Sequence, residues 1–346
     1  MLAARAGGDD RYAAPIASLP PKGSLARLRA AAARHRTAIT IVGSLLTAGV
    51  LAVVLAGRRD EFAAALSGTS ATVLLATIAL QALALIARSE AWHLTIGAAG
   101  GTIARRVLYR ASSMQVLGSV VNGQLGVAAR IAALRRSSAD VCPQVPTLVA
   151  SEVPILAVEA ALAILASFTL VAPLGLPWWL PLIGLPVIVA ASAGLRHLAL
   201  RKGRELWRGL AVLRSGRGGA SVVALVLVAV VSQVLRNWLL LRAVGVDASI
   251  FDAVAVLIAV VSLGQLPIGP SVGAAAAVLI LGHDGVAAAA AAGVMMTVTG
   301  TLGGLGFLSW AGADHTWCRH RARRDARARA RARAWVLRPQ PQRQPG

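Results

Sequence analysis

Long apolar stretches dominate this sequence, and each is close to or longer than the ~20 residues with which a helix crosses a ~30 Å hydrocarbon core. A backbone in lipid must satisfy its own polar groups, so stretches of this length can span only as helices. We therefore predict an all-α polytopic integral membrane protein, with about six to eight transmembrane helices. The stretches are 37–56, 70–87, 145–172, 178–194, 220–241, 251–266 and 286–310.

The composition agrees with a membrane domain that has short polar ends. Charged residues make up 14% of the 346 residues, whereas about a quarter is usual for soluble domains. We expect three parts. Residues 1–36 would be a disordered basic leader with a short amphipathic helix, residues 37–312 the transmembrane domain, and residues 313–346 a disordered Arg-rich cytoplasmic tail.

Positive charge is concentrated at the ends of the predicted spans. The net charge is +21, and basic clusters next to apolar spans are typical of cytoplasmic loops that face anionic lipid. We predict a multi-pass protein of the plasma membrane with both termini in the cytoplasm. Its basic loops and tail would contact anionic headgroups, and no nucleic-acid partner is expected. Tryptophans at predicted span ends, among them Trp92, fit an aromatic belt.

Two hydrophobic segments are broken by polar or helix-breaking residues. Segment 111–129 has basic residues on both sides and the turn signal Asn122-Gly123. A re-entrant hairpin would leave both flanks cytoplasmic, and a full crossing is the alternative. Segment 265–285 begins with QLPIGPSVG, which contains two prolines and two glycines. Broken segments in corresponding halves of a chain indicate the binding site of a transporter.

Few ionisable residues lie inside the predicted spans. Glu152 and Glu159 are nearly two helical turns apart, so they share a face. Each carboxylate could bind a headgroup or proton, or could instead pair with a neighbouring helix. Arg130 and Arg236 could each hold a lipid phosphate bidentately. The alternatives are a cytoplasmic anchor for Arg130 and snorkelling to the interface for Arg236.

The candidate substrate-binding residues are therefore the polar and helix-breaking residues of these segments. No catalytic sequence motif and no His/Cys cluster is present, so we expect no enzyme activity, no metal and no cofactor. The glycine-rich stretch 300–307 is predicted to allow close helix packing. The candidates are Glu152, Glu159, Arg130, Arg236, Asn122, Gln124, Gln265, Pro267, Gly269, Pro270 and Gly273.

Five features follow one another along the chain: a helix ending near Arg88–Trp92, NGQLGVAARIAAL (122–134), SEVPILAVEA (151–160), LRAVGVDASIFDAVAV (241–256) and QLPIGPSVGAAAAVLIL (265–281). In this order they resemble the transmembrane region of the lysylphosphatidylglycerol synthases, the flippase-like family. Gly123, Gly126 and Arg130 match the first family motif, whereas Ala276 stands where the family carries a glutamate. The resemblance covers roughly residues 37–312 and implies a flippase-like membrane domain. The synthases also carry a soluble aminoacyl-transferase domain, which we do not expect after residue 312.

Three functions are compatible with these features. The first is binding or translocation of a phospholipid or polyprenyl-linked lipid, through a polar cavity lined by the two broken segments. The second, an alternative to transport, is a non-transporting membrane partner that organises a cell-envelope enzyme or glycosyltransferase complex. The third, an intramembrane lipid-modifying enzyme, lacks an evident catalytic constellation.

Overall fold

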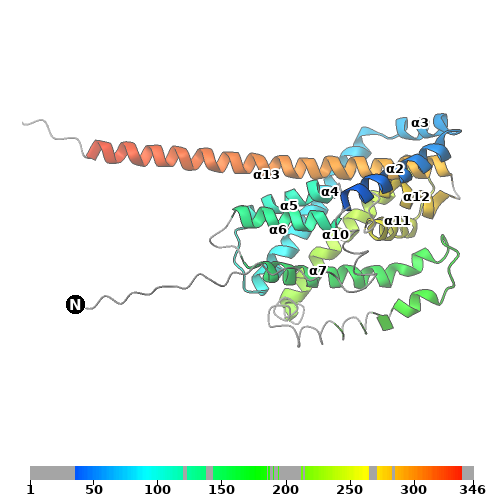
Figure 1. Ribbon diagram of the computed structural model, residues 1–346, viewed down its shortest axis with the longest axis horizontal. Coiled ribbons are helices and arrows are strands. Elements are labelled where there is room, and N and C mark those ends of the chain that lie inside the picture. Colours follow the sequence, from blue (N-terminus) through cyan, green and yellow to red (C-terminus); the bar gives the residue numbers. More distant parts are fainter. Residues whose placement is uncertain are drawn as a thin grey trace, which may run out of the picture. The chain divides into compact units, whose positions relative to one another are not determined.

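The computed structural model is all-helical in its described part, as the sequence predicts (Figure 1). It describes residues 36–119, 123–137, 143–184, 186–187, 190, 194, 212, 215–264, 271–282 and 285–336. Contacts divide the chain into a short N-terminal unit, Met1–Ile39, and a main unit, Thr40–Gly346. Every site discussed below belongs to the main unit. The expected leader, residues 1–36, falls almost entirely outside the described residues.

The helices whose bounds are described are ten α-helices and one 3₁₀-helix. In chain order these are α2 (Arg36–Leu55), α3 (Arg59–Ser67), α4 (Ala71–Ala98), α5 (Arg105–Ser119), α6 (Gly123–Ser137), α7 (Val145–Leu165), η1 (Ala166–Leu170), α10 (Gly216–Ala243), α11 (Ile250–Leu263), α12 (Val272–Leu281) and α13 (Val286–Val336).

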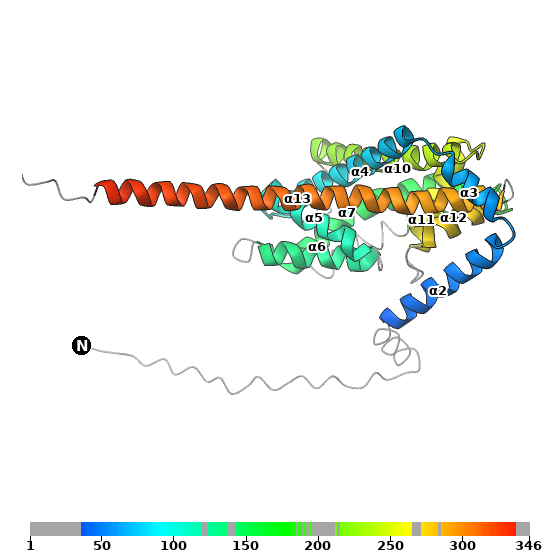
Figure 2. The ribbon, with the colours of Figure 1, turned by 90° about the horizontal axis from the view of Figure 1, so that it is seen from above.

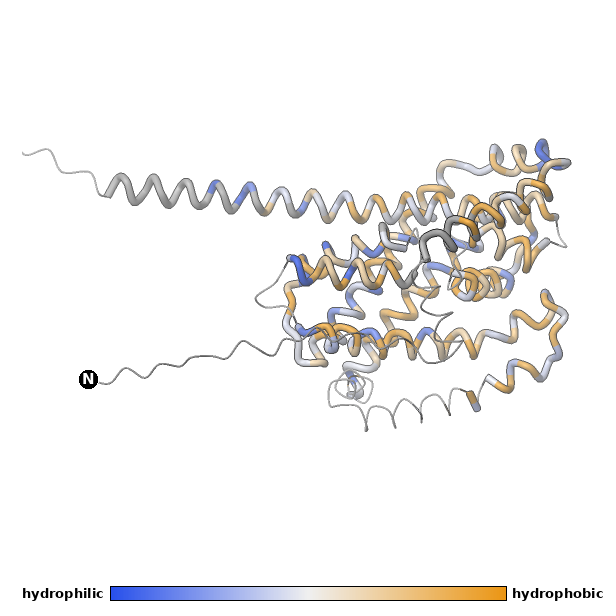
Figure 3. Tube along the Cα trace, viewed as in Figure 1, coloured by the Kyte–Doolittle hydropathy of each residue, from blue (hydrophilic) through white to orange (hydrophobic). Residues whose placement is uncertain are grey.

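Four helical segments in this part of the chain are long and apolar enough to cross a membrane, which indicates a multi-pass membrane protein. They are Ala71–Ala98, Val145–Leu170, Gly216–Ala243 and Val286–Cys318. Large apolar side chains on the helices are exposed, for example Leu75 at 68% and Val53 at 77%. Apolar residues run along most helices (Figure 3), and such surfaces suit contact with lipid better than contact with water. The expected total of six to eight spans stays a prediction.

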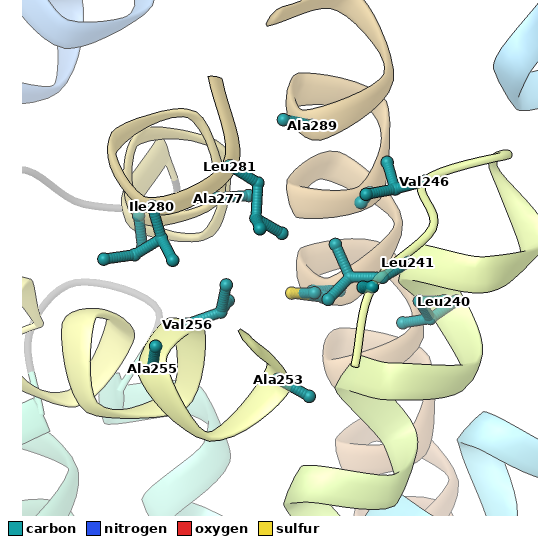
Figure 4. Packing of buried hydrophobic residues seen from close by; sticks show 14 of the residues in the cluster. Leu240, Leu241, Val246, Ala253, Ala255, Val256, Ala277, Ile280, Leu281 and Ala289 are labelled. Atoms are coloured by element: carbon teal, nitrogen blue, oxygen red, sulfur yellow. The ribbon is translucent and has the colours of Figure 1, made fainter. Parts of the chain in front are cut away.

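Small residues bring the last helices close together. The largest buried cluster joins α10, α11, α12 and α13, where Leu241, Val256 and Leu281 pack with several alanines (Figure 4). A Cβ atom on Gly273 of α12 would lie 2.7 Å from the carbonyl oxygen of Gly293 on α13. Backbones that approach this closely leave no room for side chains between them, as at small-residue interfaces of membrane helices.

Helices α5 and α6 form a helical hairpin, and they lie side by side in two views (Figures 1 and 2). Glycines make the contact: a Cβ on Gly118 would lie 2.6 Å from the carbonyl oxygen of Leu125, and a Cβ on Gly126 would lie 2.9 Å from that of Gln115. The predicted hairpin at 111–129 is therefore present but longer, from Arg105 to Ser137. Its re-entry into the membrane stays a prediction.

Helix α13 runs into the segment that was expected to be a disordered tail. It extends from Val286 to Val336, and the domain boundary at residue 312 stays a prediction. Alanine and arginine are both strong helix formers, and the sequence contains no glycine or proline between 313 and 336. Local propensity therefore sustains the helix although the segment has no apolar face. Residues 337–346 lie outside the described residues.

Candidate functional site

A buried ion pair joins the hairpin to the first half of α7. Arg130 of α6 donates a hydrogen bond from Nη2 to Oε1 of Glu152 on α7. Arg130 is 1% exposed and Glu152 is 6% exposed. The two residues were separate candidates in the sequence, and the structure brings them together. Arg130 is therefore held inside the helix bundle, and the side of the membrane on which it lies stays a prediction.

Trp92 of α4 completes this arrangement. The guanidinium carbon of Arg130 lies 3.8 Å from the centroid of the Trp92 ring, a geometry that stabilises the cation through the ring's negative face. The indole Nε1 donates to Oγ of Ser151 at 2.9 Å. Trp92 is fully buried, so its expected place in an aromatic belt is wrong. The reason is tertiary: α6 and α7 cover the face of α4 that carries it.

A second ion pair lies between α4 and α7. Arg88 binds Glu159 bidentately, with Nη1–Oε1 at 2.9 Å and Nη2–Oε2 at 3.0 Å. The side chains are 34% and 25% exposed. Arg88 and Trp92 are one turn apart on α4, so their side chains share a face. The two glutamates likewise share a face of α7, as their seven-residue spacing predicts.

The four charges of these pairs, Arg88, Glu159, Arg130 and Glu152, are hereafter called the paired site. Two arginines balance two carboxylates, which lowers the cost of placing charge inside an apolar helix bundle. The Nε atoms of Arg88 and Arg130 are buried and have no hydrogen-bond partner among the described atoms. Each guanidinium therefore keeps a donor that its carboxylate does not use.

Arg236 lies on α10 and has different partners. Its Nη1 donates to Oε1 of Gln81 on α4, and its Nη2 lies 3.4 Å from Oδ1 of Asn237. Arg236 is 8% exposed, so snorkelling to the interface is wrong, because the side chain points between helices instead of along the helix surface. None of its described contacts involves the paired site.

The remaining candidates divide into two groups. Gly273 begins the contact of α12 with α13, where a Cβ would lie 2.8 Å from Oγ1 of Thr297. Gly273 therefore lies at a close contact between two helices. Gln124 is described only as part of the α6 backbone. The others lie outside the described residues: Asn122, Gln265, Pro267, Gly269 and Pro270.

Polar contacts that were not expected from the sequence join the first turns of α5 to α4 and α13. Tyr109 donates to Oε1 of Glu90 on α4 at 2.5 Å, and Arg110 Nη2 lies 2.6 Å from Oδ2 of Asp314 on α13. The Tyr109 hydroxyl is the donor of this contact and the Glu90 carboxylate is the acceptor. The hairpin is thus held by α4 and α13 at this end, and by Glu152 of α7 through Arg130.

We expect Trp92→Phe to lower the free energy of unfolding by about 1–2 kcal/mol, because the hydrogen bond to Ser151 is lost and the cation–π contact weakens. Trp317→Phe is the matched control, since Trp317 is 72% exposed. Thermal unfolding of the detergent-solubilised protein measures both. Equal effects of the two substitutions would contradict the assigned role of Trp92.

No protein-family model matches this chain, and no curated protein or solved structure is detectably similar to it. Within the described residues, no group of three or more His, Cys, Asp or Glu side chains could hold a metal ion. The paired site itself presents guanidinium and carboxylate groups, which can recognise charged groups of a ligand.

Proposed function

We propose that this protein is a flippase-like membrane protein that binds and translocates a lipid with a charged headgroup. The observation that supports this most directly is the half-exposed Arg88–Glu159 pair beside the buried Arg130–Glu152 pair. Ionisable residues inside apolar spans are costly and usually mark a pathway for a substrate or ion. The sequence resemblance to the flippase-like family supports the same function.

The half-exposed pair can exchange partners with a headgroup. A lipid phosphate offers two oxygens in the geometry that Glu159 now offers to Arg88. An amine on the same headgroup could take the place of Arg88 at Glu159. Because one ion pair replaces another, the charge balance inside the helix bundle does not change. A charged headgroup would then enter the bundle at lower cost than through lipid alone.

The buried pair, Arg130 and Glu152, would keep the surrounding helices together while the half-exposed pair exchanges partners. Arg130 and Glu152 join the hairpin to α7, and Trp92 links them to the face of α4 that carries Arg88. A headgroup that separates Arg88 from Glu159 changes the α4–α7 contact. That change would reach the hairpin through Trp92 and Arg130. Headgroup binding would in this way change the access of lipid to the paired site.

The test is lipid movement in proteoliposomes, measured with labelled anionic, aminoacylated and polyprenyl lipids. We expect the wild-type protein to move one class, and Glu159→Gln to slow it at least about tenfold, because a charge-assisted contact contributes about 1.5–3 kcal/mol. Glu61→Gln is the matched control, since the Glu61 side chain on α3 is 66% exposed. It should move lipid at the wild-type rate.

Two results would contradict the proposal. If Glu159→Gln keeps the full rate, the paired site does not bind the headgroup. If the folded wild-type protein moves no lipid, transport is wrong, and the alternative of a membrane partner for a cell-envelope enzyme becomes the better hypothesis.

A further inference from the structure

Arg236 is a buried cation without a carboxylate in the described part of the chain. The other arginines held within the helix bundle there each contact one: Arg88 contacts Glu159, Arg130 contacts Glu152, and Arg110 contacts Asp314. Arg236 is only 8% exposed, and it lies inside one of the four membrane-length helices. A buried guanidinium with no opposite charge is costly in such surroundings, so the protein retains a charge that something else must balance.

The partners that Arg236 does have are neutral. Gln81 and Asn237 offer amide oxygens, and the Nε atom of Arg236 is buried with no partner among the described atoms. A guanidinium has five N–H donors, and two amide oxygens do not use all of them. Amide groups can also turn, so that their NH₂ donors face a bound anion. Arg236, Gln81 and Asn237 together therefore supply donors to an anion and no negative charge that would repel it.

Helix α13 is shaped to accommodate these side chains. A Cβ on Gly300 would lie 3.2 Å from Nη1 of Arg236, and a Cβ on Gly303 would lie 2.7 Å from Cγ of Gln81. The two glycines are one turn apart, so they present one face to α4 and α10. From the sequence, this glycine-rich stretch was expected to allow helix packing, and in the structure two of its glycines make room for polar side chains.

Further buried polar residues lie along the same three helices. Thr77 is one turn before Gln81 on α4, Ser232 is one turn before Arg236 on α10, and Thr299 precedes Gly300 on α13. Each hydroxyl donates to a carbonyl of its own helix, and each can rotate to donate elsewhere. We call these three residues, with Gln81, Arg236 and Asn237, the polar seam.

We propose that Arg236 binds an oxyanion, a phosphate or a carboxylate, in the polar seam between α4, α10 and α13, at a site separate from the paired site. Two parallel N–H groups of a guanidinium match two oxygens of one oxyanion. The amides of Gln81 and Asn237 can hold the same group. The oxyanion could belong to a lipid headgroup or be free in solution, and the two sources share this chemistry.

The test is binding to the purified full-length protein in uncharged detergent. Inorganic phosphate is one titrant, phosphatidylglycerol in mixed micelles is the second, and diacylglycerol, which has no phosphate, is the control lipid. Thermal stabilisation and calorimetric titration are the readouts. The variants are Arg236→Gln and, as matched control, Arg242→Gln on the same helix, whose side chain is 49% exposed.

We expect the wild-type protein to bind phosphate or phosphatidylglycerol but not diacylglycerol. Arg236→Gln should bind at least about tenfold more weakly, as for the loss of a charge-assisted contact, and Arg242→Gln should bind like the wild type. Binding of both titrants means that the site admits free oxyanions. Binding of phosphatidylglycerol alone means that the site opens toward the lipid. If Arg236→Gln does not fold, Arg236→Lys is the second variant. It keeps the positive charge but lacks the two parallel N–H groups of the guanidinium, so it should bind with intermediate affinity.

The proposal is overturned if the folded wild-type protein binds neither titrant, or if Arg236→Gln binds as tightly as the wild type. It is also overturned if Arg242→Gln loses binding equally, since that would indicate attraction by the general positive charge. Its outcome is independent of lipid translocation: a protein that binds phosphate through Arg236 but moves no lipid would support this site and contradict the proposed function.

Discussion

Arg130→Met is expected to lower the free energy of unfolding by about 3–5 kcal/mol, because it leaves a buried carboxylate without its counter-charge. Glu152 is 6% exposed and its described ion-pair partner is Arg130. The methionine side chain replaces much of the packing of the arginine stem, so the loss measures mainly the charge. Denaturant unfolding in detergent micelles, followed by tryptophan fluorescence, gives the change.

The double variant Arg130→Met/Glu152→Gln separates charge from packing. Removal of both charges should recover most of the lost stability, since a buried pair replaced by neutral residues is often close to neutral in free energy. The matched control is Arg242→Met, whose partner Asp247 is 96% exposed, and it should cost less than about 1 kcal/mol. A double variant that is no more stable than Arg130→Met would show that packing, and not charge balance, determines the stability of this region.

Gly293→Ala is expected to destabilise the fold by about 3 kcal/mol, the upper part of the range for overpacked cores. A Cβ at this position would overlap the Ala274 backbone and the Gly273 carbonyl oxygen of α12. These are backbone atoms, so no side chain can rotate away, and the helices α12 and α13 must separate. Thermal unfolding of the purified protein measures the loss.

Gly306→Ala is the matched control for this prediction. It lies on the same helix, and a Cβ there would have no atom within 4 Å. Alanine favours helix by about 0.5–1 kcal/mol over glycine, so this variant should be as stable as the wild type or more stable. Equal loss at both positions would contradict a close contact between α12 and α13, and would indicate a general intolerance of α13 to substitution.

The fold class and the hairpin were predictable because their signals are local. An apolar run of helical length is recognised from adjacent residues, and four such helices are found in the described part. The basic flanks and the Asn122-Gly123 turn signal likewise lie within one short stretch, and the described helices are α5, which ends at Ser119, and α6, which begins at Gly123. Helix propensity in the Arg/Ala segment is also local, and α13 continues through that segment to Val336 although the segment has no apolar face.

The partners of the charged residues were not predictable in this way. Arg88 and Glu159 are 71 positions apart, and Arg236 and Gln81 are 155 positions apart. Which residues meet depends on how α4 is rotated and shifted against α7 and α10, and a shift of one residue turns a helical side chain by about 100°. Arg88 and Trp92 therefore resembled residues just past the end of the 70–87 span, and Gln81 resembled an ordinary span residue, although each contacts a charged candidate.

The sequence alone determined that this chain is helical and apolar, and that few charges lie within its spans, because hydrophobicity and helix propensity act between neighbouring residues. The tertiary structure alone decided which of those charges are balanced. Glu152 and Glu159 each meet an arginine, whereas Arg236 meets only amides in the described part of the chain. The physical reason is that charge compensation acts through space over a few ångströms, and only the packing of helices far apart in sequence determines those distances.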